Sequence, residues 1–198
     1  EVERFAADGV TEVSLLGQNV NSYGRDLTLA ARRGERPEGV PPEAPVEWST
    51  GSRWIDDPAQ RARPLFGDLL RAVGNVEGIG RVRYTSPHPK DLRSDVMWAM
   101  ADTESVCEHL HLPLQSGSDR VLGAMHRGYT AERYLARLAE SRSIIDDLAV
   151  TTDIIVGFPG ETEADFEQTL ALAAEAQFDS AYTFVFSPRK GTEAADMT

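Results

Sequence analysis

Short apolar runs alternate with amphipathic stretches along most of this chain. β-Branched or alternating runs bounded by glycine, proline or polar residues predict strands, and apolar residues spaced three and four apart predict the helices between them. One strand and one helix recur about every 30 to 40 residues, which is typical of repeated βαβ crossovers. We therefore expect an α/β fold with a parallel sheet or barrel and five strands, at 11–16, 81–85, 109–114, 148–156 and 181–186.

The stretch Thr151–Glu163 shows this unit most clearly. Its run Ile154–Val156 is short, β-branched and uninterrupted, which predicts a parallel strand covered on both faces. Gly157 and Gly160 then permit a tight turn in which the backbone approaches a neighbour closely. A strand end, a glycine turn and a helix start form a corner that accepts ligands, although an ordinary βα connection fits the same pattern.

The helix after this turn has a clear start signal. Thr162 followed three residues later by Asp165 resembles a capping box. The spacing of apolar residues then predicts that the helix, ending near Gln177, buries one face made of Phe166, Leu170, Ala173 and Ala174.

Polar or glycine-rich loops follow all five predicted strands. Such loops converge on one face of a parallel sheet or barrel, where ligand sites are placed. We expect a nucleoside-like ligand there, held by amides, hydroxyls and backbone groups, and find no obvious nucleophile or acid–base pair. The loops are Gln18 and Asn19, Ser86–His88, Gln115 and Ser116, Gly157–Glu161, and Ser187–Arg189.

Between Thr28 and Pro64 the periodic pattern gives way to charge, glycine and proline. Repeated prolines interrupt regular structure, so we interpret residues 28–64 as a surface insertion. The 198 residues are otherwise enough for one core, and we expect a single domain spanning 1–198.

Charge and cysteine content limit the possible functions. A net charge of −12 argues against nucleic-acid binding through overall basicity, while leaving a local basic patch open. Cys107 is the only cysteine, so the chain cannot build a disulfide framework or a thiolate-only metal site. Cys107, His109 and His111 alternate along one strand face and could share a metal, but a polar interior layer of a barrel explains them without an ion.

The N-terminus and the hydropathy of the chain indicate in which compartment the protein lies. No apolar run approaches the roughly 20 residues that cross a bilayer, and the N-terminus lacks the features of a signal peptide. We therefore expect a cytoplasmic protein with no membrane contact. The sequence begins at Glu1 inside a helical pattern, which favours a fragment of a longer protein.

Six motifs follow one another in a fixed order: Leu15–Gly24, Thr85–Pro89, His111–Asp119, Arg127–Thr130, Thr152–Glu163, and Gly191 with Thr192. In this order they resemble the radical S-adenosylmethionine methylthiotransferases, and among these the tRNA-modifying members most. The resemblance covers nearly the whole chain outside 28–64. Several ordered motifs are far more specific than a lone glycine pattern.

This resemblance implies a fold and a reaction. The fold is a partial (β/α)6 radical-SAM barrel, open and TIM-like, here lacking its first strand. The reaction adds a methylthio group to C2 of N6-dimethylallyladenosine next to the tRNA anticodon. S-adenosyl-L-methionine and two 4Fe–4S clusters are the implied cofactors. The implied partners are the tRNA anticodon stem-loop and a reducing protein such as flavodoxin or ferredoxin, and the implied state is a monomer.

One departure from the family pattern is decisive for activity. The family carries Cys-x-x-x-Cys-x-x-Cys after its first barrel strand, and these thiolates ligate the cluster that binds S-adenosylmethionine. None of these cysteines is present here, so we expect this fragment alone to be inactive. With the later motifs intact, truncation explains their absence better than a degenerate enzyme.

The resemblance also assigns cofactor-binding residues by position. Gln18 and Asn19 occupy the place where radical-SAM enzymes contact the methionine amino group, although the Gly-Glu pair familiar from those enzymes is absent. Gln115 and Ser116 lie where ribose and methionine contacts are usual, and Arg142 is a carboxylate partner. The adenine-contacting strand end loosely follows Gly-x-Ile-x-Gly-x-x-Glu and comprises Asp153, Ile155, Val156, Gly157 and Phe158.

Substrate contacts are assigned to His88, Arg127 and Arg189, and no catalytic residue or metal ligand is assigned. Two alternatives remain at this point. A ribosomal-protein aspartate methylthiotransferase shares the barrel, but its loop begins Gln-Asp, so Gln18 and Asn19 favour the tRNA enzyme. A non-catalytic RNA-binding remnant fits the missing cysteines but fits an acidic chain poorly.

Overall fold

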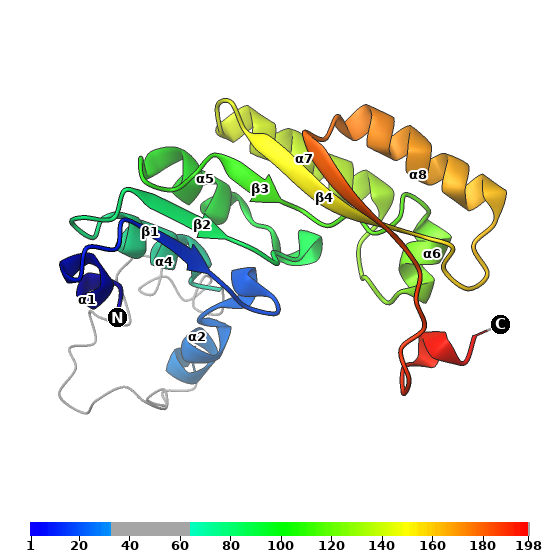
Figure 1. Ribbon diagram of the computed structural model, residues 1–198, viewed down its shortest axis with the longest axis horizontal. Helices are drawn as coiled ribbons and strands as arrows, with labels where there is room; N and C mark the ends of the chain where they lie inside the picture. The colour runs from blue at the N-terminus through cyan, green and yellow to red at the C-terminus, as the bar shows by residue number, and fades with distance from the viewer. Residues whose placement is uncertain (33–63, 198) are drawn as a thin grey trace. The chain divides into compact units, whose positions relative to one another are not determined.

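A computed structural model of the protein describes residues 1–32 and 64–197. Within these ranges five strands form two parallel sheets, one of order β1-β2 and one of order β3-β4-β5 (Figure 1). The predicted parallel α/β class is confirmed. The strands are β1 (Glu12–Leu15), β2 (Arg81–Tyr84), β3 (His109–His111), β4 (Ala149–Val156) and β5 (Ser180–Val185).

Two compact units are distinguished by their internal packing. The first comprises Glu1–Thr85 and Arg93–Cys107, and the second comprises Ser86–Leu92 and Glu108–Thr198. The single domain predicted from the sequence stays a prediction. So does the insertion at 28–64, whose first residues belong to a helix and whose remainder up to residue 63 lies outside the described residues.

The first unit packs helices against β1 and β2. Phe66 and Tyr84 meet edge to face, with ring centroids 5.0 Å apart, and the Tyr84 hydroxyl donates to Met100 Sδ at 3.0 Å. Gly67 has no room for a side chain, because a Cβ there would lie 2.8 Å from the Asp95 carbonyl oxygen. The helices are α1 (Val2–Ala7), α2 (Arg25–Arg32), α4 (Phe66–Gly74) and α5 (Ser94–Asp102).

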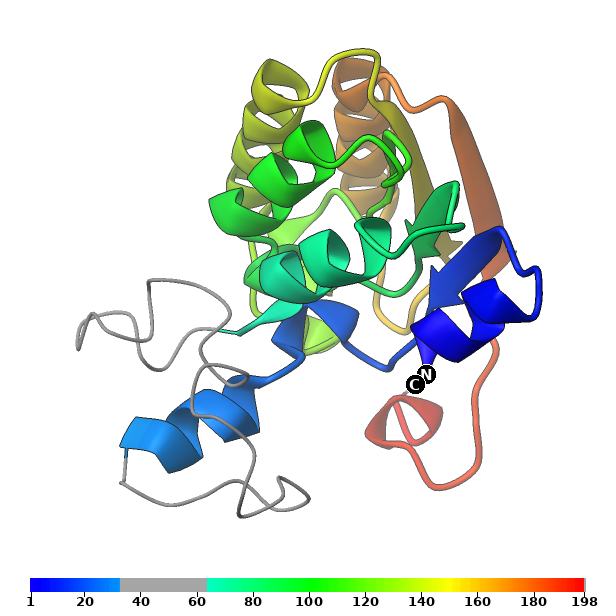
Figure 2. The ribbon, with the colours of Figure 1, turned by 90° about the vertical axis from the view of Figure 1, so that its left-hand side faces the viewer.

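In the second unit two long helices cover one face of the three-stranded sheet. α7 (Ala131–Ile144) and α8 (Glu163–Ala176) lie side by side, on the same side of β4 and β5 in both views (Figures 1 and 2). Along β4, Val150, Thr152 and Ile154 are buried. The alternate residues belong to the opposite face, because successive side chains of a strand point to opposite sides. The short helix α6 (Asp119–Ala124) follows β3.

The predicted buried face of α8 is only partly correct. Phe166 and Ala173 are half-buried, but Leu170 is 53% exposed and Ala174 is exposed. The fully buried residues are Asp165, Thr169, Leu172 and Ala176. The buried side of the helix is shifted because two of its polar side chains bond to the loop after β3. A count of apolar positions cannot detect polar residues that are satisfied by distant partners.

β3 ends at His111, earlier than the predicted end at Leu114. Pro113 has no N–H group for the sheet, so the ladder is interrupted there. The Thr152 hydroxyl donates to the Leu112 carbonyl at 2.8 Å and accepts the Leu114 N–H at 2.8 Å. The ladder resumes when the Gln115 N–H donates to the Asp153 carbonyl at 2.8 Å.

Two buried tyrosines also donate to carbonyl groups of this break. The Tyr134 hydroxyl donates to Leu112 at 2.7 Å, and the Tyr129 hydroxyl donates to Leu114 at 2.9 Å. Burial raises the pKa of Tyr129 to about 12, and burial also raises the pKa of Tyr134. Both hydroxyls therefore keep their protons at neutral pH and remain donors. Side chains thus fix the path of the chain into the loop after β3.

Replacing Thr152 by valine tests this account. Valine keeps the shape and β-branching but removes the hydroxyl, which leaves the buried Leu114 N–H without an acceptor. We expect Thr152→Val to lower the free energy of unfolding by about 1–3 kcal/mol, measured by urea denaturation. Thr183→Val is the matched control, because Thr183 is exposed on β5, and it should change stability by less than about 0.5 kcal/mol. Equal effects of the two substitutions would contradict the account.

Candidate functional site

A pocket of about 560 Å³ opens where β3, β4 and β5 end. All its lining residues belong to the second unit. The carboxyl ends of parallel strands are the usual place for ligand sites in α/β proteins. Its lining includes Gln115, Arg127, Asp153, Ile155, Phe184, Phe186, Arg189 and Thr192.

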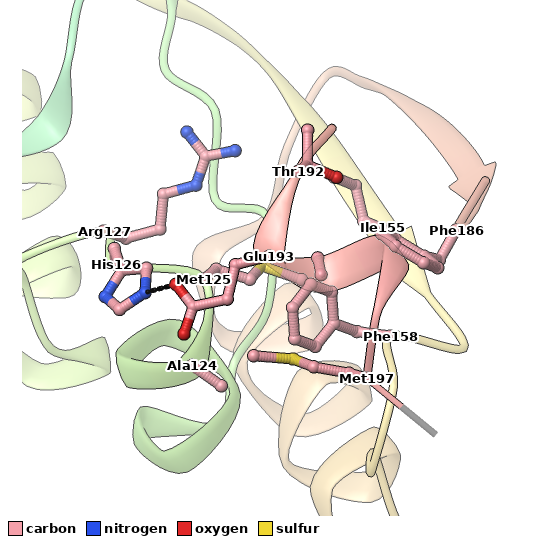
Figure 3. Close-up of a pocket in the computed structure, with 11 residues that line it drawn as sticks. Ala124, Met125, His126, Arg127, Ile155, Phe158, Phe186, Thr192, Glu193 and Met197 are labelled. Carbon is pink, nitrogen blue, oxygen red and sulfur yellow. Dashed lines mark hydrogen bonds and ion pairs between the residues drawn. The ribbon is translucent and has the colours of Figure 1, made fainter. Parts of the chain in front are cut away.

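A second, smaller hollow of about 270 Å³ shares part of this lining, including Arg127, Ile155 and Phe186. Figure 3 shows Phe158, Met125 and Met197 gathered in it, with the Arg127 guanidinium extending away from them. The rings of Phe158 and Phe186 meet edge to face with centroids 5.1 Å apart. The combined site therefore has an apolar end with aromatic walls and an end with polar groups, which suits a planar ligand with a polar extension.

Gln115 is the most unusual residue of the larger pocket. Its φ of 67° lies in the left-handed region, and the Ser116 N–H reaches back to the Leu114 carbonyl at 2.9 Å, which makes a γ-turn centred on Gln115. Gln115 is only 7% exposed, and its Oε1 has no hydrogen-bond partner among the described residues. A strained backbone that holds an unpaired buried acceptor in a pocket is typical of a binding residue.

The turn after β4 is held by Glu161. Gly157 and Gly160 have φ values of 72° and 78°, as their predicted role in a tight turn requires. Glu161 Oε2 accepts the N–H groups of both Gly157 and Phe158, the latter at 3.2 Å. These backbone donors are therefore bound within the turn. Phe158 contributes its ring to the smaller hollow.

Asp165 joins the start of α8 to the start of α6. Its carboxylate accepts the Ser118 hydroxyl at 2.6 Å, the Thr162 N–H at 2.9 Å and the Arg120 guanidinium. Together with the 3.3 Å bond from the Asp165 N–H to the Thr162 hydroxyl, this confirms the predicted capping box. The Arg120 guanidinium, followed by the Ser118 and Thr162 hydrogen bonds, holds the pKa of Asp165 well below its usual range.

Thr169 makes a second connection between α8 and the loop after β3. Its hydroxyl accepts the Gly117 N–H at 2.9 Å and lies 3.3 Å from the Ser116 hydroxyl. A Cβ at Gly117 would lie 2.6 Å from the Gln168 carbonyl oxygen, so only glycine permits this approach. Ser116 is completely buried and bonds inward. The loop that carries Gln115 is thus fastened along one side of α8.

The structure gathers only part of the predicted site. Six predicted residues line one or both hollows: Gln115, Arg127, Asp153, Ile155, Phe158 and Arg189. Ser116, Val156 and Gly157 lie beside the pocket without lining it. Gln18 and Asn19 belong to the first unit, in the loop before a 3₁₀ turn.

Arg142 and His88 lie elsewhere in the second unit. Arg142 donates to the Gln177 carbonyl at 2.8 Å, at the end of α8 opposite the turn after β4, so it has no part in the pocket. The rings of His88 and Tyr129 meet edge to face at 5.7 Å, and His88 Nδ1 accepts the Lys90 N–H at 3.2 Å. Burial lowers the pKa of His88.

Several residues of the site were not found from the sequence. Phe184 lines the pocket because it pairs with Ile155 in the β4–β5 register, and that register is a tertiary property. The sequence offered a clue to Thr192, because Thr192 belongs to the Gly191 and Thr192 motif. Arg120 does not line the pocket, and nothing in the sequence indicated its bonds to Gly160 and Asp165, because an arginine near a helix start usually contacts only solvent.

The polar face predicted for β3 is held by Thr151. Its Oγ1 lies 3.1 Å from His109 Nε2 and 3.0 Å from His111 Nδ1, and His111 Nε2 lies 3.4 Å from Asp153 Oδ2. Over 1–32 and 64–197, no group of three histidine, cysteine or acidic side chains is placed to hold a metal ion. None of the helices described over these ranges has the length and apolar character needed to cross a membrane.

Comparison with known proteins identifies the class to which this fold and site belong. The model of the Radical SAM superfamily matches residues 1–173, so the chain belongs to the Radical SAM superfamily. A solved structure described as coproporphyrinogen III oxidase (HemN) from Escherichia coli, a Radical SAM enzyme, is 17% identical. It aligns over 61% of this chain and 35% of that chain with a TM-score of 0.44.

Curated relatives are considerably more similar. The chain is 51% identical over its full length to tRNA-2-methylthio-N(6)-dimethylallyladenosine synthase 1 of Mycobacterium marinum, covering 34% of that protein. It is 49% identical to the synthase of the same name from Caldicellulosiruptor saccharolyticus, covering 35% of it, and 45% identical to that of Carboxydothermus hydrogenoformans, covering 37%. The chain thus spans about a third of the length of these relatives.

Replacing Asp165 by asparagine should give a pH-dependent loss of stability. Because the folded pKa is lowered, the carboxylate stabilises the protein above its unfolded pKa of about 4, and this contribution is lost as the pH falls through the folded pKa. We expect Asp165→Asn to lower the melting temperature at pH 7, and the gap to wild type to narrow steadily below about pH 4. Melting curves of both proteins between pH 2 and pH 8 measure this.

Asp102→Asn is the control, since Asp102 makes one exposed ion pair at 3.4 Å to Arg71. Its melting temperature should follow that of wild type throughout. An Asp165→Asn gap that stays constant down to the lowest pH would contradict the assignment.

Proposed function

We propose that this chain is the S-adenosylmethionine-binding part of a tRNA methylthiotransferase. The reaction adds a methylthio group to C2 of N6-dimethylallyladenosine next to the anticodon. The observation that carries the proposal is the 45–51% identity, over the full length of this chain, to relatives that bear the name of this synthase. The motif order and the pocket at the strand ends support it.

In this proposal the two hollows hold S-adenosylmethionine. The adenine lies at the apolar end, between Ile155 and the rings of Phe158 and Phe186, because aromatic walls suit a planar base. Gln115 Oε1 accepts a hydrogen bond from an N–H or O–H group of the ligand, which satisfies its unpaired buried oxygen. The apolar walls also exclude water from the bound nucleoside.

Arg127 and Arg189 face the substrate in this arrangement. Both line the larger pocket, and guanidinium groups suit RNA phosphates because they form bidentate, charge-assisted bonds. Arg127 Nε is buried and has no hydrogen-bond partner among the described residues, so it can donate to a bound group. Such a local basic contact is compatible with the acidic net charge of the chain.

S-adenosylmethionine bound at a reduced 4Fe–4S cluster would supply radical chemistry, and a second molecule would supply the methyl group. The residues of this chain fit the nucleoside but not the clusters, because Cys107 is the only cysteine and a cluster with an open iron needs three thiolates. The ligands of both clusters belong to other parts of the full-length enzyme. The residues described here bind and orient the nucleoside.

The remaining parts of the proposal come from the family resemblance. The partners are the tRNA anticodon stem-loop and a reducing protein such as flavodoxin or ferredoxin, and the enzyme acts as a cytoplasmic monomer. A ribosomal-protein methylthiotransferase is the nearest alternative, and the Gln18 and Asn19 pair together with the names of the relatives favours tRNA. An RNA-binding remnant without activity is the third reading.

The substrate is tested by expressing the full-length protein in a bacterial strain that lacks 2-methylthio modification of tRNA. We expect mass spectrometry of digested tRNA to detect 2-methylthio-N6-dimethylallyladenosine. A methylthio group on a ribosomal protein with unmodified tRNA would favour the first alternative. Binding of tRNA without any modification, despite reconstituted clusters, would favour the RNA-binding remnant.

Gln115→Leu tests the proposed acceptor. Leucine has a similar size but removes Oε1, so a ligand donor in the pocket loses its partner. We expect the Kd for S-adenosylhomocysteine, measured by calorimetric titration of the full-length protein, to rise about tenfold. Gln168→Leu is the matched control, because Gln168 is exposed on α8 and bonds to the Ala164 carbonyl of its own helix. An unchanged Kd for Gln115→Leu would remove Gln115 from the binding site.

A further inference from the structure

Two loops carry the residues that form the proposed nucleoside site, and no ladder holds either loop beyond the bonds between Gln115 and β4. The loop after β3 carries Gln115, and the turn after β4 carries Phe158. The Ile155 N–H donates to the Gln115 carbonyl at 2.8 Å, but beyond this bond the chains diverge into α6 and α8. The relative position of the two loops therefore depends on side chains.

Arg120 lies at the start of α6, after the first loop, and binds the turn after β4 and the start of α8. Its guanidinium donates to the Gly160 carbonyl at 2.6 Å, and it forms a fork on the Asp165 carboxylate, with Nε 3.3 Å from Oδ1. Arg120 lies in the first turn of α6, whose N-cap Ser118 binds the same carboxylate at 2.6 Å. One side chain thus connects the start of α6, the apex of the turn after β4 and the start of α8.

The carbonyl that Arg120 binds belongs to Gly160, where the turn has little other packing. Gly160 has a φ of 78°, and a Cβ there would meet no atom within 4 Å, so packing around Gly160 does not fix this part of the turn. Within the turn, Glu161 binds the Gly157 and Phe158 N–H groups and so makes it a rigid unit. The Arg120 contact then decides where that unit lies relative to α6.

The geometry points to a role for Arg120 as a positioning residue, which holds the turn after β4 against the start of α6 so that Phe158 and Gln115 together form the nucleoside site. The identity of the ligand in this inference rests on the proposed function. The effect of Arg120 on the position of the turn does not. Arg120 does not line either hollow and so does not touch the ligand. The fork requires a planar guanidinium, and a lysine ammonium cannot reproduce it.

The test uses Arg120→Lys, which keeps the positive charge, in the full-length protein. Hydrogen exchange measures the Gly157, Phe158 and Glu161 amides, which are bonded within the turn. We expect Arg120→Lys to accelerate their exchange about tenfold, with exchange in β4 unchanged. Titration should show a Kd for S-adenosylhomocysteine that rises about tenfold.

Arg137→Lys is the matched control, because Arg137 also pairs with a carboxylate, that of Glu140, but both residues belong to α7, so the pair connects no loops. It should leave both measurements at their wild-type values. A second variant, Arg120→Ala, is compared with Arg120→Lys in both measurements and in melting temperature. If Arg120→Lys keeps the wild-type exchange rates and Kd while Arg120→Ala does not, the positive charge alone is sufficient and the inference is overturned.

The remaining outcomes separate this inference from the proposed function. Unchanged exchange in Arg120→Lys would overturn the positioning role, whatever the affinity. Faster exchange with an unchanged Kd would overturn the connection between the turn and binding. Faster exchange in a protein whose wild type binds no S-adenosylhomocysteine would support the position of the turn and count against the proposed function.

Discussion

The site in the second unit depends on one buried carboxylate. Asp165 is the point at which α6, α8 and the turn after β4 are joined, through Ser118, Thr162 and Arg120. A carboxylate that is 6% exposed is costly to bury without partners, and here several donors surround it. The same interaction rotates α8 away from its apolar pattern, so that polar groups of the helix face the loop after β3.

That loop is irregular because the sheet is interrupted, and the interruption is stabilised by hydroxyl groups. Pro113 removes one donor from the ladder. The hydroxyls of Thr152, Tyr129 and Tyr134 then bind the Leu112 and Leu114 carbonyl groups beside it. The chain can then adopt the γ-turn that brings Gln115 into the pocket. A strained, polar loop at a strand end is the expected cost of a binding site in an α/β fold.

The proposed division of work follows from these contacts. Gln115 and Phe158 face the nucleoside and Arg127 faces the substrate, whereas Arg120, Glu161 and Asp165 hold the loops that carry Gln115 and Phe158. This separation explains why only some of the residues assigned by motif position line the pocket. Ser116 and Gly157 belong to the same motifs as Gln115 and Phe158, but they support the loops.

The sequence by itself determined the presence of the five strands, the parallel α/β class and the family, because periodicity, turn residues and motif order are local properties. It also located the capping box at Thr162 and Asp165. The structure alone decided the buried face of α8, the side-chain bonds that stabilise the break after β3, the place of Phe184 and the role of Arg120. These depend on strand register and on polar bonds between residues some forty positions apart, such as Arg120 and Asp165, which no local pattern contains.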